Sequence, residues 1–155
     1  MCRRHPADRA VSLLELVTVL TIIGVMAAIG APRYANSLAL YRAQAAAARI
    51  AADVNFARSR AKTSSLGQTL TFDITGSAYT LSGVAGLNGQ ASYVVKLNAE
   101  PYAATLGSAA MGTSLTTLSF DRYGQPSAGG TVVVKSGTAT KTVIVNGVTG
   151  LASVS

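Results

Sequence analysis

An apolar run near the N-terminus constrains this chain more than any other feature of its sequence. The run extends from Leu13 to Ala31, reads LLELVTVLTIIGVMAAIGA, and has Glu15 as its one charged residue. Because a helix rises about 1.5 Å per residue, the run is close in length to the ~30 Å hydrocarbon core of a bilayer. We therefore assign residues 11–31 to one transmembrane helix.

The charges before this run predict its orientation. Arg3, Arg4 and Arg9 stand against Asp8 in the first ten residues, and basic residues beside a span stay in the cytoplasm. We expect an inner N-terminus and an outer head. A cleaved secretory signal is the alternative, since small residues end the run. The run is longer than a usual signal core, and Glu15 costs about 2.5–3.5 kcal/mol at mid-bilayer, less near the end of a span.

The next segment, residues 32–64, is Ala-rich and has no Gly and no further Pro after Pro32, which predicts an amphipathic continuation of the helix to about Thr63. At 100° per residue this segment has two apolar faces. One holds Leu38, Tyr41, Ala45, Ala48, Ala52 and Phe56, and the other holds Ala43, Ala47, Ile50, Val54, Ala57 and Ala61. We expect one face to pack on the chain's own sheet and the other to suit close approach of a helix from another chain. The alternative is that the head covers both faces.

Beyond Ser65 the pattern changes to short strands separated by Gly, Asn and Ser turns. Leu70, Phe72 and Ile74 alternate with polar residues. Residues 79–81 follow a turn at 76–77 and complete a hairpin with them. Further strands are expected at 93–97, 117–120, 131–135, 142–145 and 151–154. The fold class is therefore α+β, with a long N-terminal helix packed on an antiparallel β-sheet head of residues 65–155.

Catalytic chemistry has few candidates in this sequence. Cys2 is the one cysteine and His5 the one histidine, and both lie in the basic segment before the apolar run. The later carboxylates are scattered singly, and there is no nucleophile elbow or phosphate-binding loop. We expect no catalytic, cofactor or metal site, and no enzyme activity.

The segment from Ala10 to Pro32, AVSLLELVTVLTIIGVMAAIGAP, resembles the N-terminal signature of type IV pilins and type II secretion pseudopilins. In that family a short basic leader is cut on the cytoplasmic face, just before a hydrophobic segment whose fifth residue is Glu. Counted from Val11, the fifth residue here is Glu15. Pro32 falls where the family has its helix-bending proline. The family usually has Gly before the cut and an aromatic residue after it, whereas this chain has Ala10 and Val11.

The resemblance implies that residues 1–10 are a leader removed by a prepilin peptidase between Ala10 and Val11, with N-methylation of Val11. The new amine at Val11 would be a cation beside an apolar helix, and Glu15 of a neighbouring subunit can neutralise it in one axial register. Alternatively, Glu15 lies in the headgroup layer. Gly24 and Pro32 weaken the helix, so that it can bend when the subunit leaves the bilayer; a simple break at the membrane exit is the other interpretation of Pro32.

A second, less specific resemblance covers the head. The segment FDRYGQP, Phe120–Pro126, is followed by a strand, a Gly turn and TVIVNGVTG, and this pattern resembles the H-type (GspH/FimT) minor pseudopilins and minor pilins. It implies a single-pass subunit of the bacterial inner membrane with a periplasmic head. Its partners would be other pilin or pseudopilin subunits, in a type II secretion pseudopilus or a type IV pilus at the cell surface.

Two other functions are weighed against assembly. Some minor pilins of this group serve DNA uptake, and contact with nucleic acid requires clustered basic residues. Residues 65–155 carry only four basic and three acidic side chains, although Arg122, Lys135 and Lys141 could converge in the fold. The third hypothesis is an anchored protein that never assembles, for which the N-terminus would stay intact at Met1.

Overall fold

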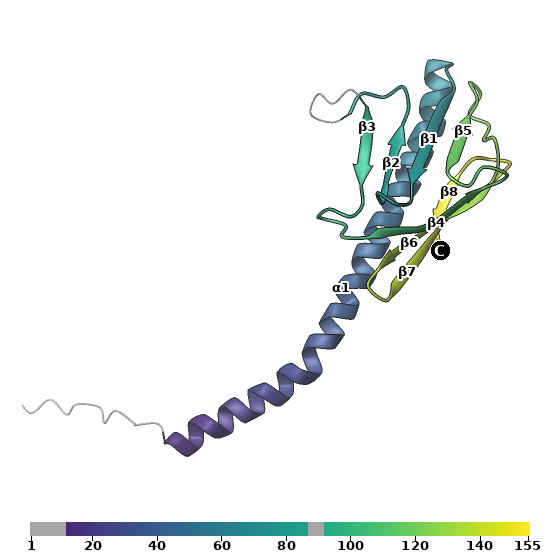
Figure 1. The fold of residues 1–155 in the computed structure, drawn as a ribbon. Coiled ribbons are helices and arrows are strands. Elements are labelled where there is room, and N and C mark those ends of the chain that lie inside the picture. Colours follow the sequence, from purple (N-terminus) through teal and green to yellow (C-terminus); the bar gives the residue numbers. More distant parts are fainter. Residues whose placement is uncertain (1–11, 87–91) are drawn as a thin grey trace, which may run out of the picture. The chain divides into compact units, whose positions relative to one another are not determined.

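The computed structural model describes residues 12–86 and 92–155. This part of the chain has one helix and eight strands (Figure 1). The elements are α1 (Leu13–Ser64), β1 (Gln68–Asp73), β2 (Ala78–Leu81), β3 (Tyr93–Lys96), β4 (Thr105–Met111), β5 (Thr117–Phe120), β6 (Gly130–Ser136), β7 (Ala139–Val145) and β8 (Ala152–Val154). The chain divides into two compact units, an N-terminal unit (Met1–Ala35) and a head unit (Asn36–Ser155), with the boundary inside α1.

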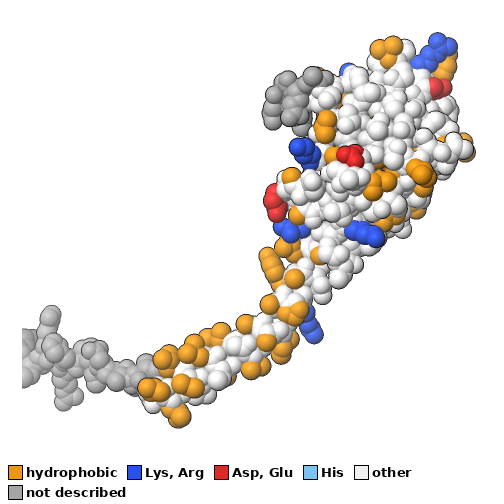
Figure 2. All heavy atoms as spheres, in the orientation of Figure 1, with side chains coloured by type: hydrophobic (Ala, Val, Ile, Leu, Met, Phe, Trp, Pro, Cys, Tyr) orange, Lys and Arg blue, Asp and Glu red, His pale blue; other side chains and the backbone are white. Residues whose placement is uncertain are grey.

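The described part of the N-terminal unit is a helix that is apolar on all sides. Every large apolar side chain from Leu13 to Ile29 is between 47% and 80% exposed, and Figure 2 shows such side chains along the helix. An 18-residue window of α1 reaches a mean hydropathy of 2.3, so the helix can cross a membrane by length and composition. A helix that is hydrophobic all round requires apolar surroundings.

The two threonines of this helix satisfy their own hydroxyl groups. Thr18 Oγ1 donates to the carbonyl of Leu14 at 2.6 Å, and Thr21 Oγ1 donates to the carbonyl of Thr18 at 2.8 Å. A hydroxyl without a partner is costly in hydrocarbon, and these bonds remove that cost. The threonines are therefore compatible with a lipid environment.

In the head unit, α1 buries one face that is built mainly from alanine. This face includes the whole predicted stripe, Ala43, Ala47, Ile50, Val54, Ala57 and Ala61, together with Ala46, Ala51 and Asp53. Small side chains let a sheet approach the helix axis closely. The expectation that one helix face packs on the chain's own strands is confirmed.

Four of the six residues on the other predicted face are exposed in the described structure, and Leu38 and Ala45 are half-buried. Tyr41 is 71% and Phe56 46% exposed, and Ala48 and Ala52 between them are also exposed. The alternative in which the head covers both faces is therefore wrong for this part of the helix.

The head contains two antiparallel four-stranded sheets, β3-β2-β1-β5 and β4-β6-β7-β8, where the sequence predicted one. In the first sheet the predicted hairpin forms in register, with Leu70 opposite Leu81 and Phe72 opposite Tyr79. β5 then pairs with β1 across a long sequence separation. Alternation predicts which segments are strands but not which strands pair over such distances, and the number of sheets depends on that pairing.

Strand β4 is the element that the sequence did not predict. Its residues, TLGSAAM, include only one β-branched side chain, and its pairing with β6 is irregular between Leu106 and Ser108. Leu106, Ala109 and Met111 are buried in the same core as the helix face and both sheets. Tertiary packing makes this segment a strand, because its local preference for β structure is weak.

Candidate assembly site and the polar network of the head

The residues predicted for processing and assembly lie near the start of the chain. Ala10 and Val11 are outside the described residues, so cleavage and methylation stay predictions. Glu15 is exposed in the first turn of α1, where Leu16 N–H donates to the carbonyl of Ser12 at 3.1 Å. The N-terminal end of a helix dipole favours a carboxylate, so the first turn of α1 is a suitable place for Glu15.

The two residues predicted to bend the helix both lie within α1. A Cβ added at Gly24 would meet no atom within 4 Å, and the helix continues through Pro32. Pro32 has no N–H, so the carbonyl of Ala28 lacks its helical donor. A break at Pro32 is not present in the structure, and the role of the two residues in bending stays a prediction.

The open face of α1 in the head unit suits another helix. Its exposed alanines, Ala48 and Ala52, are one turn apart and lie between the larger Tyr41 and Phe56. Small residues allow two helix backbones to approach closely, and aromatic side chains at either end add contact area.

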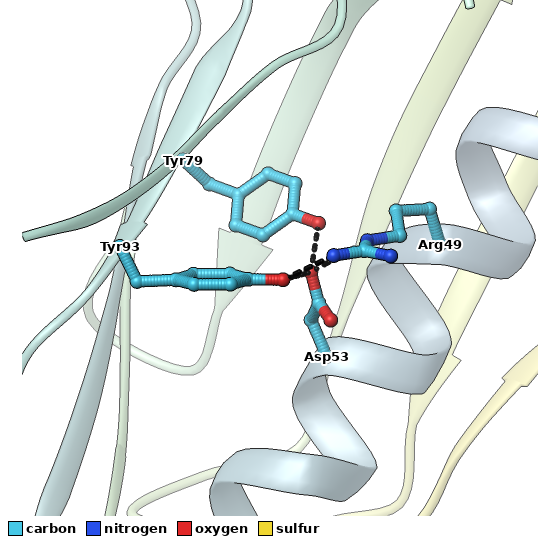
Figure 3. A network of polar contacts seen from close by, with 4 residues as sticks. All are labelled: Arg49, Asp53, Tyr79 and Tyr93. Carbon is cyan, nitrogen blue, oxygen red and sulfur yellow. Dashed lines mark hydrogen bonds and ion pairs between the residues drawn. The ribbon is translucent and has the colours of Figure 1, made fainter. Parts of the chain in front are cut away.

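A buried polar network joins α1 to the first sheet (Figure 3). The Oδ2 atom of Asp53 accepts hydrogen bonds from the hydroxyl of Tyr79 at 2.5 Å, the hydroxyl of Tyr93 at 2.9 Å and Nε of Arg49 at 3.1 Å. Arg49 also donates to the hydroxyl of Tyr93. Three donors, one of them the guanidinium of Arg49, thus converge on one carboxylate oxygen. The network therefore ties β2 and β3 to α1 through one charge.

Burial and the charge of Asp53 shift the pKa values of the neighbouring side chains. Burial first, and then the Asp53 carboxylate, raise the pKa of Tyr79 far above its ordinary value. Burial and the hydrogen bond to Asp53 also raise the pKa of Tyr93. Burial lowers the pKa of Arg49, but Asp53 and Tyr93 outweigh it and the net shift is upward. Both tyrosines thus stay protonated donors, and the arrangement holds structure together without a free nucleophile or base.

The position of Asp53 in the sequence is a signal for this network. Asp53 carries a charge, yet it is only 6% exposed. It lies three residues after Ile50 and four before Ala57, which are both on the buried stripe. A charged residue at such a position needs buried partners, and the inward tyrosines of the strands provide them.

A second polar tie protects the edge of the other sheet. The side chain of Asn55 donates to the carbonyl of Ala152 at 3.2 Å and accepts from its N–H at 3.0 Å. β8 is an edge strand, and Asn55 therefore satisfies backbone groups that would otherwise be open to pairing.

The basic residues considered for nucleic acid do not form one cluster. Lys141 is opposite Val134 and shares its face of the second sheet, whereas Lys135 follows Val134 and lies on the other face. Arg122 belongs to the turn after β5, in which Asp121 Oδ1 accepts from the N–H groups of Tyr123 and Gln125. Asp121 is thus a turn carboxylate.

The described residues contain no group of three or more His, Cys, Asp or Glu side chains that could hold a metal ion. The long helix packed against antiparallel sheets defines a subunit of the pilin class. Residues 46–150 match the family described as type II transport protein GspH. This match covers more than half of the chain, which therefore belongs to that family. Its members are structural subunits, so the chain is not an enzyme.

Two solved structures share the fold. Both are crystal structures of the type IV minor pilin FimU from Pseudomonas aeruginosa strain PAO1, in different space groups. The first has a TM-score of 0.54 at 15% identity, covering 73% of this chain and 87% of FimU; the second has 0.50 at 16%, covering 72% and 91%. No curated protein sequence matches the chain. The resemblance drawn from the N-terminal and turn motifs is confirmed.

Proposed function

We propose that this chain is a minor pilin or pseudopilin that is cut between Ala10 and Val11, held in the bacterial inner membrane by residues 11–31, and assembled into a type II secretion pseudopilus or type IV pilus. The observation that carries the proposal is α1 itself. Its first part is apolar on all sides, and its second part forms the core of the head. Family membership adds assembly with other pilin-like subunits.

The first assembly contact joins Glu15 to the N-terminal amine of Val11 on another subunit. An amine and a carboxylate attract each other strongly only where water is excluded, as between packed apolar helices. Because either charge alone is costly there, the pair selects the register in which they meet. The exposed carboxylate in the first turn of α1 supports this role.

The second contact uses the open face of α1 between Tyr41 and Phe56. The head leaves this face uncovered, and its central alanines permit a neighbouring helix to approach. We expect the two contacts to act together, because both lie on the same helix.

A charge-neutral substitution tests the first contact. Glu15→Gln keeps the shape of the side chain but cannot neutralise an amine, so we expect at least a tenfold loss of the protein from sheared filaments, with unchanged abundance in the membrane. Glu100→Gln is the matched control, because Glu100 is an exposed carboxylate of the head. Wild-type assembly by the Glu15→Gln protein would mean that the amine–carboxylate pair does not select the register.

A further inference from the structure

The open face of α1 carries no exposed charge between its two large aromatic residues. From residue 40 to residue 56 the exposed side chains of the helix are Leu40, Tyr41, Gln44, Ala48, Ala52 and Phe56. Small residues at the centre of this face let another helix approach closely. When two helices pack along an apolar stripe, the charged residues that flank the stripe determine which partner binds. The flanks of the open face therefore bear on the identity of its partner.

Five cations flank the open face, and two of them are neutralised within the chain. At 100° per residue they lie in two rows, which are Arg42, Arg49 and Arg60 on one side and Arg58 and Lys62 on the other. Arg42 pairs with Glu100 at 2.9 Å, and Arg49 pairs with Asp53 at 3.1 Å. These are the ion pairs of the described residues. The unmatched positive charge is therefore concentrated beside the C-terminal part of the face, near Phe56.

The three unmatched cations are positioned by loops of the head. Nη2 of Arg60 donates to a backbone carbonyl of the loop after β2 at 3.2 Å. A Cβ added at Gly150 would lie 3.3 Å from Cδ of Arg58, and one added at Gly124 would lie 2.6 Å from Cε of Lys62, so both stems lie against glycines. These contacts place the cations without neutralising them. A carboxylate that approaches them therefore meets side chains that lose little conformational entropy on binding.

A second copy of this chain would bring the same excess of positive charge to the contact. In the head unit α1 has five basic side chains and one acidic side chain, Asp53, which is buried. The other described carboxylate side chains do not belong to this stretch of the helix. They are Glu15 in the N-terminal unit and Asp73, Glu100 and Asp121 in the strands and loops of the head.

Like charges that face each other across a contact disfavour it, whereas opposite charges favour it and fix its register. Two copies that pack side by side through their open faces place cations against cations. A helix that carries carboxylates beside its apolar stripe gains attraction at the same positions. The charges on the flanks therefore favour an unlike subunit over a second copy.

We propose that the open face of α1 packs against the helix of an unlike pilin-like subunit, whose own apolar stripe is flanked by carboxylates opposite Arg58, Arg60 and Lys62. This inference rests on the proposed function, because it names the partner of the second assembly contact. The apolar face supplies contact area, and the flanking cations select the partner and its axial register.

Photo-cross-linking in native membranes tests the proposal. Benzoylphenylalanine in place of Phe56 keeps an aromatic side chain on the open face and bonds to the chain in contact with it. We expect the product to join this chain to a helical peptide of an unlike subunit, with Asp or Glu close to the attachment point. Arg58→Glu combined with Lys62→Glu should reduce the yield at least fivefold through repulsion, whereas Arg58→Lys combined with Lys62→Arg should keep most of it. Lys141→Glu, on the second sheet, is the control that should change nothing.

Three results would overturn the proposal. The first is attachment to another copy of this chain, whichever of its carboxylates is nearest. The second is a yield that the charge reversal leaves unchanged, and the third is no product in a subunit that is processed and present in sheared filaments. The N-terminal mass and the filament fraction of the same sample show processing and assembly, so a failure of the proposed function is recognised separately.

Discussion

The two parts of α1 differ in where their apolar side chains find partners. In the N-terminal unit the large apolar side chains of Leu13 to Ile29 are all exposed, whereas in the head unit one face is buried and the other is open. Composition follows this difference, since the first part is rich in Leu, Ile and Val and the buried face of the second is rich in Ala. A helix that contacts lipid or other subunits gains from large apolar side chains. A helix that packs closely against two sheets needs small side chains on the contact face.

The largest expected change in the stability of the head comes from a substitution of the buried Asp53. Asp53→Asn removes the ionised acceptor of two tyrosines and an arginine, and we expect the free energy of unfolding to fall by about 2–4 kcal/mol. Chemical denaturation of the full chain in detergent, followed by near-ultraviolet circular dichroism, measures the change. Glu100→Gln, at an exposed ion pair, should cost less than about 1 kcal/mol. Equal effects would show that the network does not stabilise the head.

The two faces of the helix can be compared directly by making the same change, Ala to Leu, on each face. Ala47 is fully buried, so Ala47→Leu should overpack the interface and lower the free energy of unfolding by about 1–3 kcal/mol. Ala52→Leu, on the open face, should change it by less than about 0.5 kcal/mol but reduce recovery in filaments. If Ala52→Leu leaves assembly unchanged, the open face is not a contact.

Alkaline pH should lower the free energy of unfolding of the head, because the pKa values of two of its tyrosines are raised. The pKa values of Tyr79 and Tyr93 are raised in the folded state, so their contribution is complete below the ordinary tyrosine pKa of about 10 and is lost as pH rises above it. Each tyrosine should remove up to about 1.4 kcal/mol per pH unit above that value. Denaturation curves between pH 8 and 11 measure the slope, and Tyr79→Phe should make it shallower. An unchanged slope in Tyr79→Phe would contradict a raised pKa at this residue.

The sequence predicted the elements of this molecule better than their connections. Helix α1 and the hairpin of β1 and β2 follow from periodicity, because each has strong local preferences. β4 was missed, since its pairing depends on β6, and the division into two sheets depends on pairing between distant strands. These are tertiary effects that local patterns do not contain.

The candidate sites divide in the same way. Glu15 could be predicted because it interrupts an apolar run, and the signature around it matches a family. The partners of Asp53 could not be predicted, because they bring together residues from the helix and from the strands of the head. The burial of Asp53 could have been suspected from the sequence, because this charged residue has helical spacing from residues of the buried stripe.

The central claim is that the chain is processed to an assembly subunit that begins at Val11, and intact-mass measurement with N-terminal sequencing of the protein from its native membrane tests it most directly. The account predicts a chain that starts at Val11 and carries a methyl group on its amine. A start at Met1 would indicate an anchored protein that is not processed, and a start near Ala31 would indicate a secreted domain; either result would contradict the account.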